Sequence, residues 1–129
     1  MILRAETARE LMTPRPLSID QSAPAGQAAA LLTERGVGAA VVIDAAGRPV
    51  GVVTKTDLLV HAREHAPGTP DGAVSGLMTP AVFSVREDTQ ARSVVEQLLA
   101  LNVHHLFVVD AAGAVVGVVT PTDVLRKLE

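Results

Sequence analysis

The chain has 129 residues, of which 48% are apolar and 19% charged, enough to bury the core of one globular domain or of two small halves. It has no cysteine, which excludes disulfides, thiolate metal sites and thiol catalysis. The net charge of −3, the scattered Lys and Arg, and an aromatic content limited to Phe83 and Phe107 argue against a nucleic-acid surface.

The first half alternates between extended and helical patterns. Residues 7–12, "TARELM", form an expected outer helix. An extended piece at residues 17–19 precedes a helix that Ser22 can cap and that runs to about residue 35. An apolar strand at 39–43, a hairpin turn between Asp44 and Gly47 and a valine-rich strand follow, and a second helix begins after Thr54.

The second half follows the same order after a linker rich in Pro and Gly at residues 65–76. Asp88 can cap a helix that ends near residue 101, and an apolar strand is expected at 106–109. A turn between Asp110 and Gly113 follows, and Pro121 suits the first position of the last helix. No segment has the apolar length of a signal peptide or a membrane span, so we expect a cytoplasmic protein.

The two halves are copies of one unit. A shift of 66 positions aligns residues 11–59 with 77–125 without a gap, with 21 identities over 49 positions. Neither small sheet is expected to hide its apolar faces alone, so the copies should pack together and enclose matched clefts. We place the first repeat at 1–64, the linker at 65–76 and the second repeat at 77–129.

The strongest shared motif is a heptad, "GVVTKTD" at residues 51–57 and "GVVTPTD" at 117–123. In a functional interpretation, the glycine admits a ligand close to the backbone, the threonine hydroxyls and helix-start amides meet a phosphate, and the aspartate accepts from ribose hydroxyls. In a structural interpretation, Thr followed by Asp three residues later is a capping box that needs no ligand. Both interpretations remain open from the sequence.

Two copies of strand, helix, "VVIDAAGRPVGVVTKTD" and helix resemble the paired cystathionine-beta-synthase (CBS) domains, the Bateman module, over nearly the whole chain. The resemblance implies an α/β (α+β) fold in which two pseudo-twofold-related β-α-β-β-α units pack through their sheets. It also implies a regulatory, energy-sensing module without catalytic activity or a required cofactor. Such a module binds AMP, ADP or ATP, with S-adenosylmethionine or NAD possible, commonly forms a homodimer, and acts on a regulated protein that the sequence does not name.

The resemblance also implies two sets of ligand-binding residues. Asp57 and Asp123 would hold ribose, the heptad threonines would line ribose and phosphate, and Thr13 and Thr79 would lie near the adenine. The first set is Thr13, Leu17, Val53, Thr54, Lys55, Thr56 and Asp57. The second set is Thr79, His104, His105, Val119, Thr120, Thr122 and Asp123.

The two sets differ where a phosphate would bind. His104 and His105 occupy positions that hold Gly38 and Ala39 in the first copy, and in related pairs this place often carries a His or Arg. Neighbouring residues of a strand point to opposite faces, so one imidazole at most should enter a given cleft. On this basis we expect Asp123→Ala to weaken nucleotide binding more than Asp57→Ala.

Other chemistry is weakly indicated. His61 and His65 are four residues apart on one helix face, but the stretch runs into a linker, and we expect no metal site there. No Ser, His and Asp arrangement and no glycine-rich phosphate loop can be recognised, so we expect no enzyme. The alternative function is a structural dimerisation module with no physiological nucleotide.

Overall fold

The computed structural model describes residues 1–80 and 83–129, which form two compact units. The first-repeat unit is the described part of Leu17–Val82, and the second-repeat unit combines Met1–Pro16 with Phe83–Glu129. Each contains a small sheet with helices, so the predicted α+β fold is confirmed. The N-terminal segment therefore lies with the second copy of the repeat rather than with the first.

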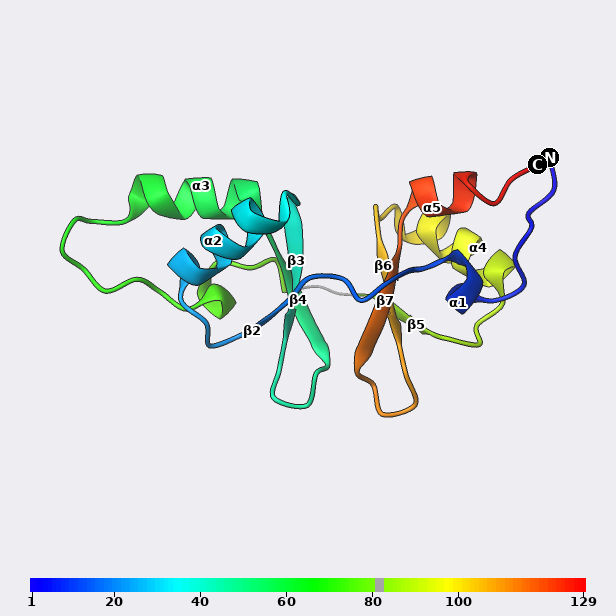
Figure 1. The fold of residues 1–129 in the computed structure, drawn as a ribbon, viewed down its shortest axis with the longest axis horizontal. Helices are drawn as coiled ribbons and strands as arrows, with labels where there is room; N and C mark the ends of the chain where they lie inside the picture. Colours follow the sequence, from blue (N-terminus) through cyan, green and yellow to red (C-terminus); the bar gives the residue numbers. More distant parts are fainter. Residues whose placement is uncertain (81–82) are drawn as a thin grey trace. The chain divides into compact units, whose positions relative to one another are not determined.

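The first-repeat unit is built on a three-stranded sheet in the order β2-β3-β4. Strands β2 and β3 are parallel, whereas β3 and β4 form an antiparallel hairpin. Helices α2 and α3 lie on the same side of this hairpin (Figure 1). The elements are β2 (Ser18–Asp20), α2 (Ala25–Arg35), β3 (Ala39–Ile43), β4 (Pro49–Thr54), α3 (Lys55–Glu64) and the 3₁₀ turn η1 (Val74–Gly76).

The second-repeat unit repeats this plan and adds one strand, giving the order β1-β7-β6-β5. Strand β1 comes from the N-terminal segment and pairs antiparallel with β7. The two chain ends lie side by side, where Ile2 and Glu129 exchange backbone hydrogen bonds (Figure 1). The elements are α1 (Ala8–Leu11), β1 (Thr13–Pro14), β5 (Ser84–Arg86), α4 (Ala91–Leu101), β6 (Leu106–Val109), β7 (Val115–Val119) and α5 (Pro121–Leu125).

Each unit has its own hydrophobic core between sheet and helices. Alternate residues of the central strands point toward the helices, as the period of two in a strand requires. The buried core of the first-repeat unit consists of Ile19, Ala23, Ala28, Leu32, Ala40, Val42, Val53 and Val74. That of the second-repeat unit consists of Ala8, Leu11, Val85, Ala91, Val94, Leu98, Leu106, Val108, Val119 and Val124.

The starts of α2 and α4 differ from the prediction. Ser22 and Asp88 do not cap these helices, whose N-cap residues are Pro24 and Gln90, without a side-chain cap. Instead, distant backbone carbonyls accept the first amide of each helix: Ala25 N donates to Gly72 O at 2.9 Å, and Ala91 N to Glu6 O at 2.8 Å. A tertiary contact therefore replaces the local cap that the sequence suggested.

The strands, turns and second helices agree closely with the prediction. Strands β3 and β6 have the expected bounds, and α3 and α5 begin directly after Thr54 and Thr120. Glycines at the two hairpin turns, Gly47 and Gly113, have φ of 80° and 87°, a conformation that glycine adopts without strain. Among the described residues, no helix combines the length and apolar character needed to cross a membrane.

Candidate functional site

The heptads place two equivalent corners where a strand meets a helix: the first corner, Thr54–Asp57, and the second corner, Thr120–Asp123. In the first, Asp57 Oδ2 accepts from Thr54 N at 2.8 Å and from Thr54 Oγ1 at 3.0 Å, and Thr54 Oγ1 accepts from Asp57 N at 3.2 Å. The second has the same three bonds at 2.8, 3.0 and 3.3 Å. The capping box is therefore present in both copies.

The two aspartates nevertheless differ in their surroundings. Asp123 is 6% exposed, and its second oxygen, Oδ1, accepts from Thr13 Oγ1 at 2.8 Å and lies 3.4 Å from Arg126 Nη1. Asp57 is only partly buried, and within the described chain the hydrogen bonds to its carboxylate all reach Oδ2. The outer oxygen of Asp57 can thus accept from a ligand without displacing a protein group.

The structure groups Thr13 and Thr79 with the opposite corners from those in the predicted sets. Thr13 pairs with Val118 in the β1–β7 ladder and bonds to Asp123, in the second-repeat unit. Thr79 forms an isolated bridge with Val52, with backbone hydrogen bonds of 2.8 and 2.9 Å, in the first-repeat unit. Each "LMTP" segment therefore lies beside the heptad of the other copy.

The heptad glycines are covered by methionines from these same segments. A Cβ placed on Gly51 would contact Met78 Sδ and lie 2.8 Å from Thr79 O and 2.9 Å from Met78 Cγ. A Cβ on Gly117 would contact Met12 Sδ and lie 2.9 Å from Met12 Cγ. The glycines thus make room for a methionine, which corrects the interpretation that they admit a ligand close to the backbone.

His104 and His105 directly precede β6, outside the strand, and have different neighbours. His104 is exposed and lines an apolar groove of about 320 Å³ between α4 and α5. The ring of His105 is 5.3 Å from that of Phe107, two residues further along the same side. Burial, with a smaller effect of His104, lowers the pKa of His105 below 6.5, so its imidazole is neutral at pH 7.

The remaining predicted residues divide into exposed and buried groups. Lys55, Thr56 and Thr122 are exposed at the two helix starts, and Leu17 is partly buried against the core. The wall candidates Val53 and Val119 are both fully buried core residues, so they are not surfaces of an open site. The structure thus brings Thr54, Lys55, Thr56 and Asp57 together in one corner, and Thr13, Thr120, Thr122 and Asp123 in the other.

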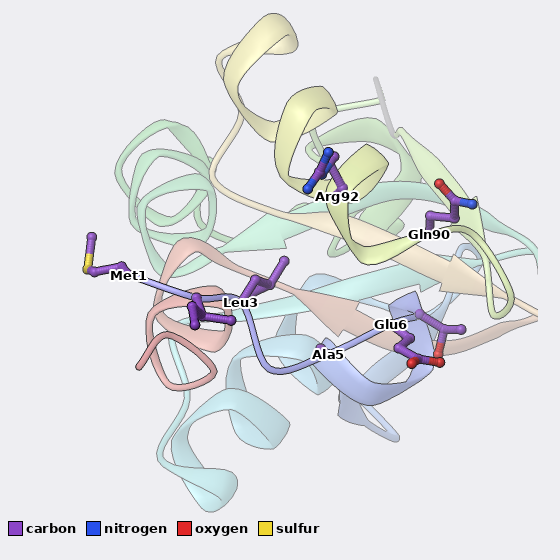
Figure 2. Close-up of a pocket in the computed structure, with 8 residues that line it drawn as sticks. Met1, Leu3, Ala5, Glu6, Gln90 and Arg92 are labelled. Atoms are coloured by element: carbon purple, nitrogen blue, oxygen red, sulfur yellow. The ribbon is translucent and has the colours of Figure 1, made fainter.

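A large cavity in the second-repeat unit contains none of the predicted residues. It measures about 700 Å³ and lies between the N-terminal segment and the start of α4. In Figure 2, Gln90 and Arg92 stand on the α4 side of this cavity, and Met1, Leu3, Ala5 and Glu6 follow one another along the opposite side. Its polar lining residues, Glu6, Thr7, Gln90 and Arg92, belong to neither heptad.

Comparison with solved structures supports the fold. CBSX2 in complex with AMP is 31% identical, with a TM-score of 0.74, and the match covers 93% of each chain. The cytosolic domain of the Mg²⁺ channel MgtE in complex with ATP is 30% identical, with a TM-score of 0.79, over 95% of this chain and 49% of that one.

Comparison with sequences points to the same family. An uncharacterised protein of Methanopyrus kandleri is 25% identical over 95 residues, and the match covers 74% of this chain but 48% of that protein. The chain therefore spans about half the length of this relative. The CBS domain family matches twice, over residues 8–64 and 74–129, in agreement with the tandem repeat. The chain belongs to the CBS domain family and contains two copies of that domain.

Proposed function

We propose that this chain is a non-catalytic regulatory module that binds an adenine nucleotide, AMP, ADP or ATP, and transmits a change of conformation to a partner protein. CBS domain pairs are generally regulatory, and the related pairs described above hold AMP and ATP. The observation that carries the proposal is Asp57 Oδ1, which accepts no hydrogen bond from residues 1–80 and 83–129 and lies in a corner with exposed Lys55 and Thr56. Competition of AMP with ATP for this corner would let the module respond to the energy state of a cell.

Each group of the first corner has a role that its chemistry supports. The Asp57 carboxylate accepts hydrogen bonds from a ribose diol through Oδ1 while Oδ2 keeps the cap intact. Lys55 N and Asp57 N already donate to Gly38 O and to Thr54 Oγ1, so the exposed Lys55 ammonium and Thr56 hydroxyl are the groups that favour a phosphate, through positive charge and a donor. This proposal revises the expectation that Asp123 is more important for binding, because Asp123 Oδ1 is already engaged by Thr13.

Asp57→Asn is expected to weaken AMP binding at least about tenfold, because hydrogen bonds to a charged acceptor contribute roughly 1.5–3 kcal/mol. Isothermal titration calorimetry with AMP, ATP, NAD and S-adenosylmethionine measures this change and ranks the ligands. Glu34→Gln, an exposed charge change on α2 of the same unit, is the matched control and should bind like the wild type. A chain that binds no adenosine compound, or an Asp57→Asn variant with unchanged affinity, contradicts the proposal.

We also propose that the module is a homodimer that uses the groove between α4 and α5. Its rim carries Leu99 and Leu125, which are 76% and 65% exposed. An isologous contact would bury both residues of each protomer, and burying a leucine contributes about 1.5–3 kcal/mol. This surface is also the specific support for the alternative function, a dimerisation module without a nucleotide.

The Leu99→Glu/Leu125→Glu double variant is expected to raise the dimer dissociation constant at least about a hundredfold. Native mass spectrometry over a concentration series measures it. Leu59→Glu, which changes a leucine that is 70% exposed on α3, serves as control and should leave the dimer intact. If Leu59→Glu alone dissociates the dimer, the contact between the protomers does not lie in the groove between α4 and α5.

A further inference from the structure

A cluster of metal-ligating side chains lies in the first-repeat unit, away from both corners. His61 is in the last turn of α3, His65 is its C-cap residue, and Asp71 comes from the linker that follows. One ligand atom from each of the three lies within 4.8 Å of the others, and His61 Nε2 is 3.0 Å from Asp71 Oδ1. The sequence shows the pair of histidines four residues apart. Asp71 joins them only because the linker folds back toward α3.

The backbone holds the carboxylate of Asp71 in place. Its Oδ2 accepts from Gly26 N at 2.5 Å in the first turn of α2, which leaves Oδ1 directed at His61. A Cβ at position 26 would lie 3.1 Å from Oδ2, so glycine gives this carboxylate room. The adjacent Gly72 O accepts from Ala25 N at 2.9 Å, which fixes the linker against the same helix start. A carboxylate with one oxygen held by the backbone and the other directed at a histidine resembles the supported ligands of metal centres.

The surroundings suit an ion with one open coordination position. The three side chains border a cavity of about 300 Å³ whose other walls are small or apolar. The side chains of His61 and Asp71 are 24% and 37% exposed, so they are partly shielded but reachable from solvent. Three protein ligands with a fourth position for water is a common arrangement for zinc.

The donor set and spacing select the metal. Two imidazole nitrogens with one carboxylate oxygen suit Zn²⁺, whereas Mg²⁺ and Ca²⁺ prefer oxygen ligands throughout. Ligands at about 2.0–2.1 Å in a tetrahedral site lie about 3.3 Å apart, which is near the separation of His61 and Asp71. His65 reaches this spacing by a rotation that releases its Nε2 from Thr69 O, now 3.0 Å away.

We propose that His61, His65 and Asp71 form a Zn²⁺ site that fastens the linker to α2 and α3. The ion replaces the hydrogen bond between His61 and Asp71 with two coordinate bonds and adds His65 to the same centre. Because the ligands come from the end of one helix and from the linker beyond it, bound zinc restrains the segment that connects the two CBS copies. The site does not depend on nucleotide binding.

Titration of the EDTA-treated protein with ZnCl₂ by calorimetry, and with Co²⁺ by visible absorption, tests the proposal. We expect one ion per chain, the visible bands of tetrahedral Co²⁺, and a rise of about 5 °C or more in the unfolding midpoint at a hundredfold excess over the dissociation constant. His65→Ala and Asp71→Asn should each weaken zinc binding at least tenfold and abolish the cobalt bands. The His104→Ala/His105→Ala variant removes the other two histidines of the chain and should retain the full affinity.

The outcomes separate clearly. Equal affinity in the wild type and in Asp71→Asn, or a stoichiometry well below one, overturns the site. Loss of zinc binding in His104→Ala/His105→Ala but not in His65→Ala also overturns it, because the ion would then be held by the other histidines. Since Asp71→Asn is almost isosteric and lies on the surface, its circular dichroism and denaturation midpoint without metal show that a loss of binding is not a loss of fold.

Discussion

Asp123→Ala is expected to lower the free energy of unfolding by about 3 kcal/mol, whereas Asp57→Ala is expected to lower it by about 1 kcal/mol. Both substitutions remove a capping box, which accounts for the smaller figure. Asp123 is also buried and bonded to Thr13, so its loss additionally leaves a hydroxyl on β1 without its acceptor. Urea denaturation followed by circular dichroism measures both variants.

Thr13→Val separates the tertiary bond from the cap. It should cost about 1 kcal/mol alone and almost nothing in addition when Asp123 is already alanine, because both changes remove the same hydrogen bond. Asp57 is the matched comparison, because it forms the same capping box without a hydrogen bond from a threonine of β1. Equal losses for the two aspartates would mean that the contact between β1 and α5 contributes no stability.

Local patterns in the sequence predicted much of the fold. The hairpin turns and the starts of α3 and α5 depend on residues within a few positions of each other, such as Thr54 with Asp57. The continuous apolar runs at residues 39–43 and 106–109 likewise indicate buried strands from residues within one segment. These features were predicted because the physical cause lies inside the segment that shows it.

The missed features depend on segments far apart in the chain. Thr13 and Asp123 are 110 residues apart, and no local pattern shows that the hydroxyl of one reaches the carboxylate of the other. The backbone partners of α2 and α4 come from Gly72 and Glu6, so the caps predicted from neighbouring residues were not needed. Asp71 reaches His61 only because the linker folds back. The difference between the two corners therefore could not be predicted from heptads that are almost identical.

The heptad glycines indicated that some group approaches the strand closely, but not that this group is the methionine of an "LMTP" segment. Each copy contains one methionine at this place and one glycine in the heptad, and these four residues form the contacts at Gly51 and Gly117. A glycine in a strand often marks the close approach of another group. The sequence did not reveal whether that group was a ligand or a side chain of the protein.

Gly51→Ala is expected to lower the free energy of unfolding by about 3 kcal/mol, and Gly117→Ala by about 1–2 kcal/mol, as overpacking of a dense core does. At position 51 the new Cβ meets the carbonyl oxygen of Thr79 at 2.8 Å, and Val52 N holds that oxygen by a hydrogen bond of 2.9 Å. At position 117 the two nearest atoms, Met12 Sδ and Cγ, can rotate away, and the atom that remains is Met12 Cβ at 3.0 Å. Thermal and urea denaturation of the two variants give the comparison.

A double-mutant cycle with each methionine tests this explanation. Met12→Ala removes Sδ and Cγ, the two atoms nearest to the new Cβ of Gly117→Ala, and leaves only Met12 Cβ at 3.0 Å, so the pair should show a favourable coupling of more than about 1 kcal/mol. Met78→Ala cannot move the Thr79 carbonyl, so it should recover less of the loss caused by Gly51→Ala. Each Met→Ala substitution also leaves a cavity, which we expect to lower the free energy of unfolding by a similar amount at the two positions. The single Met→Ala variants measure this loss, so that it can be subtracted in each cycle. Equal couplings would show that the backbone bridge between Val52 and Thr79 shifts as readily as a methionine side chain. The two glycines would then be required only to accommodate the methionine that packs on each of them.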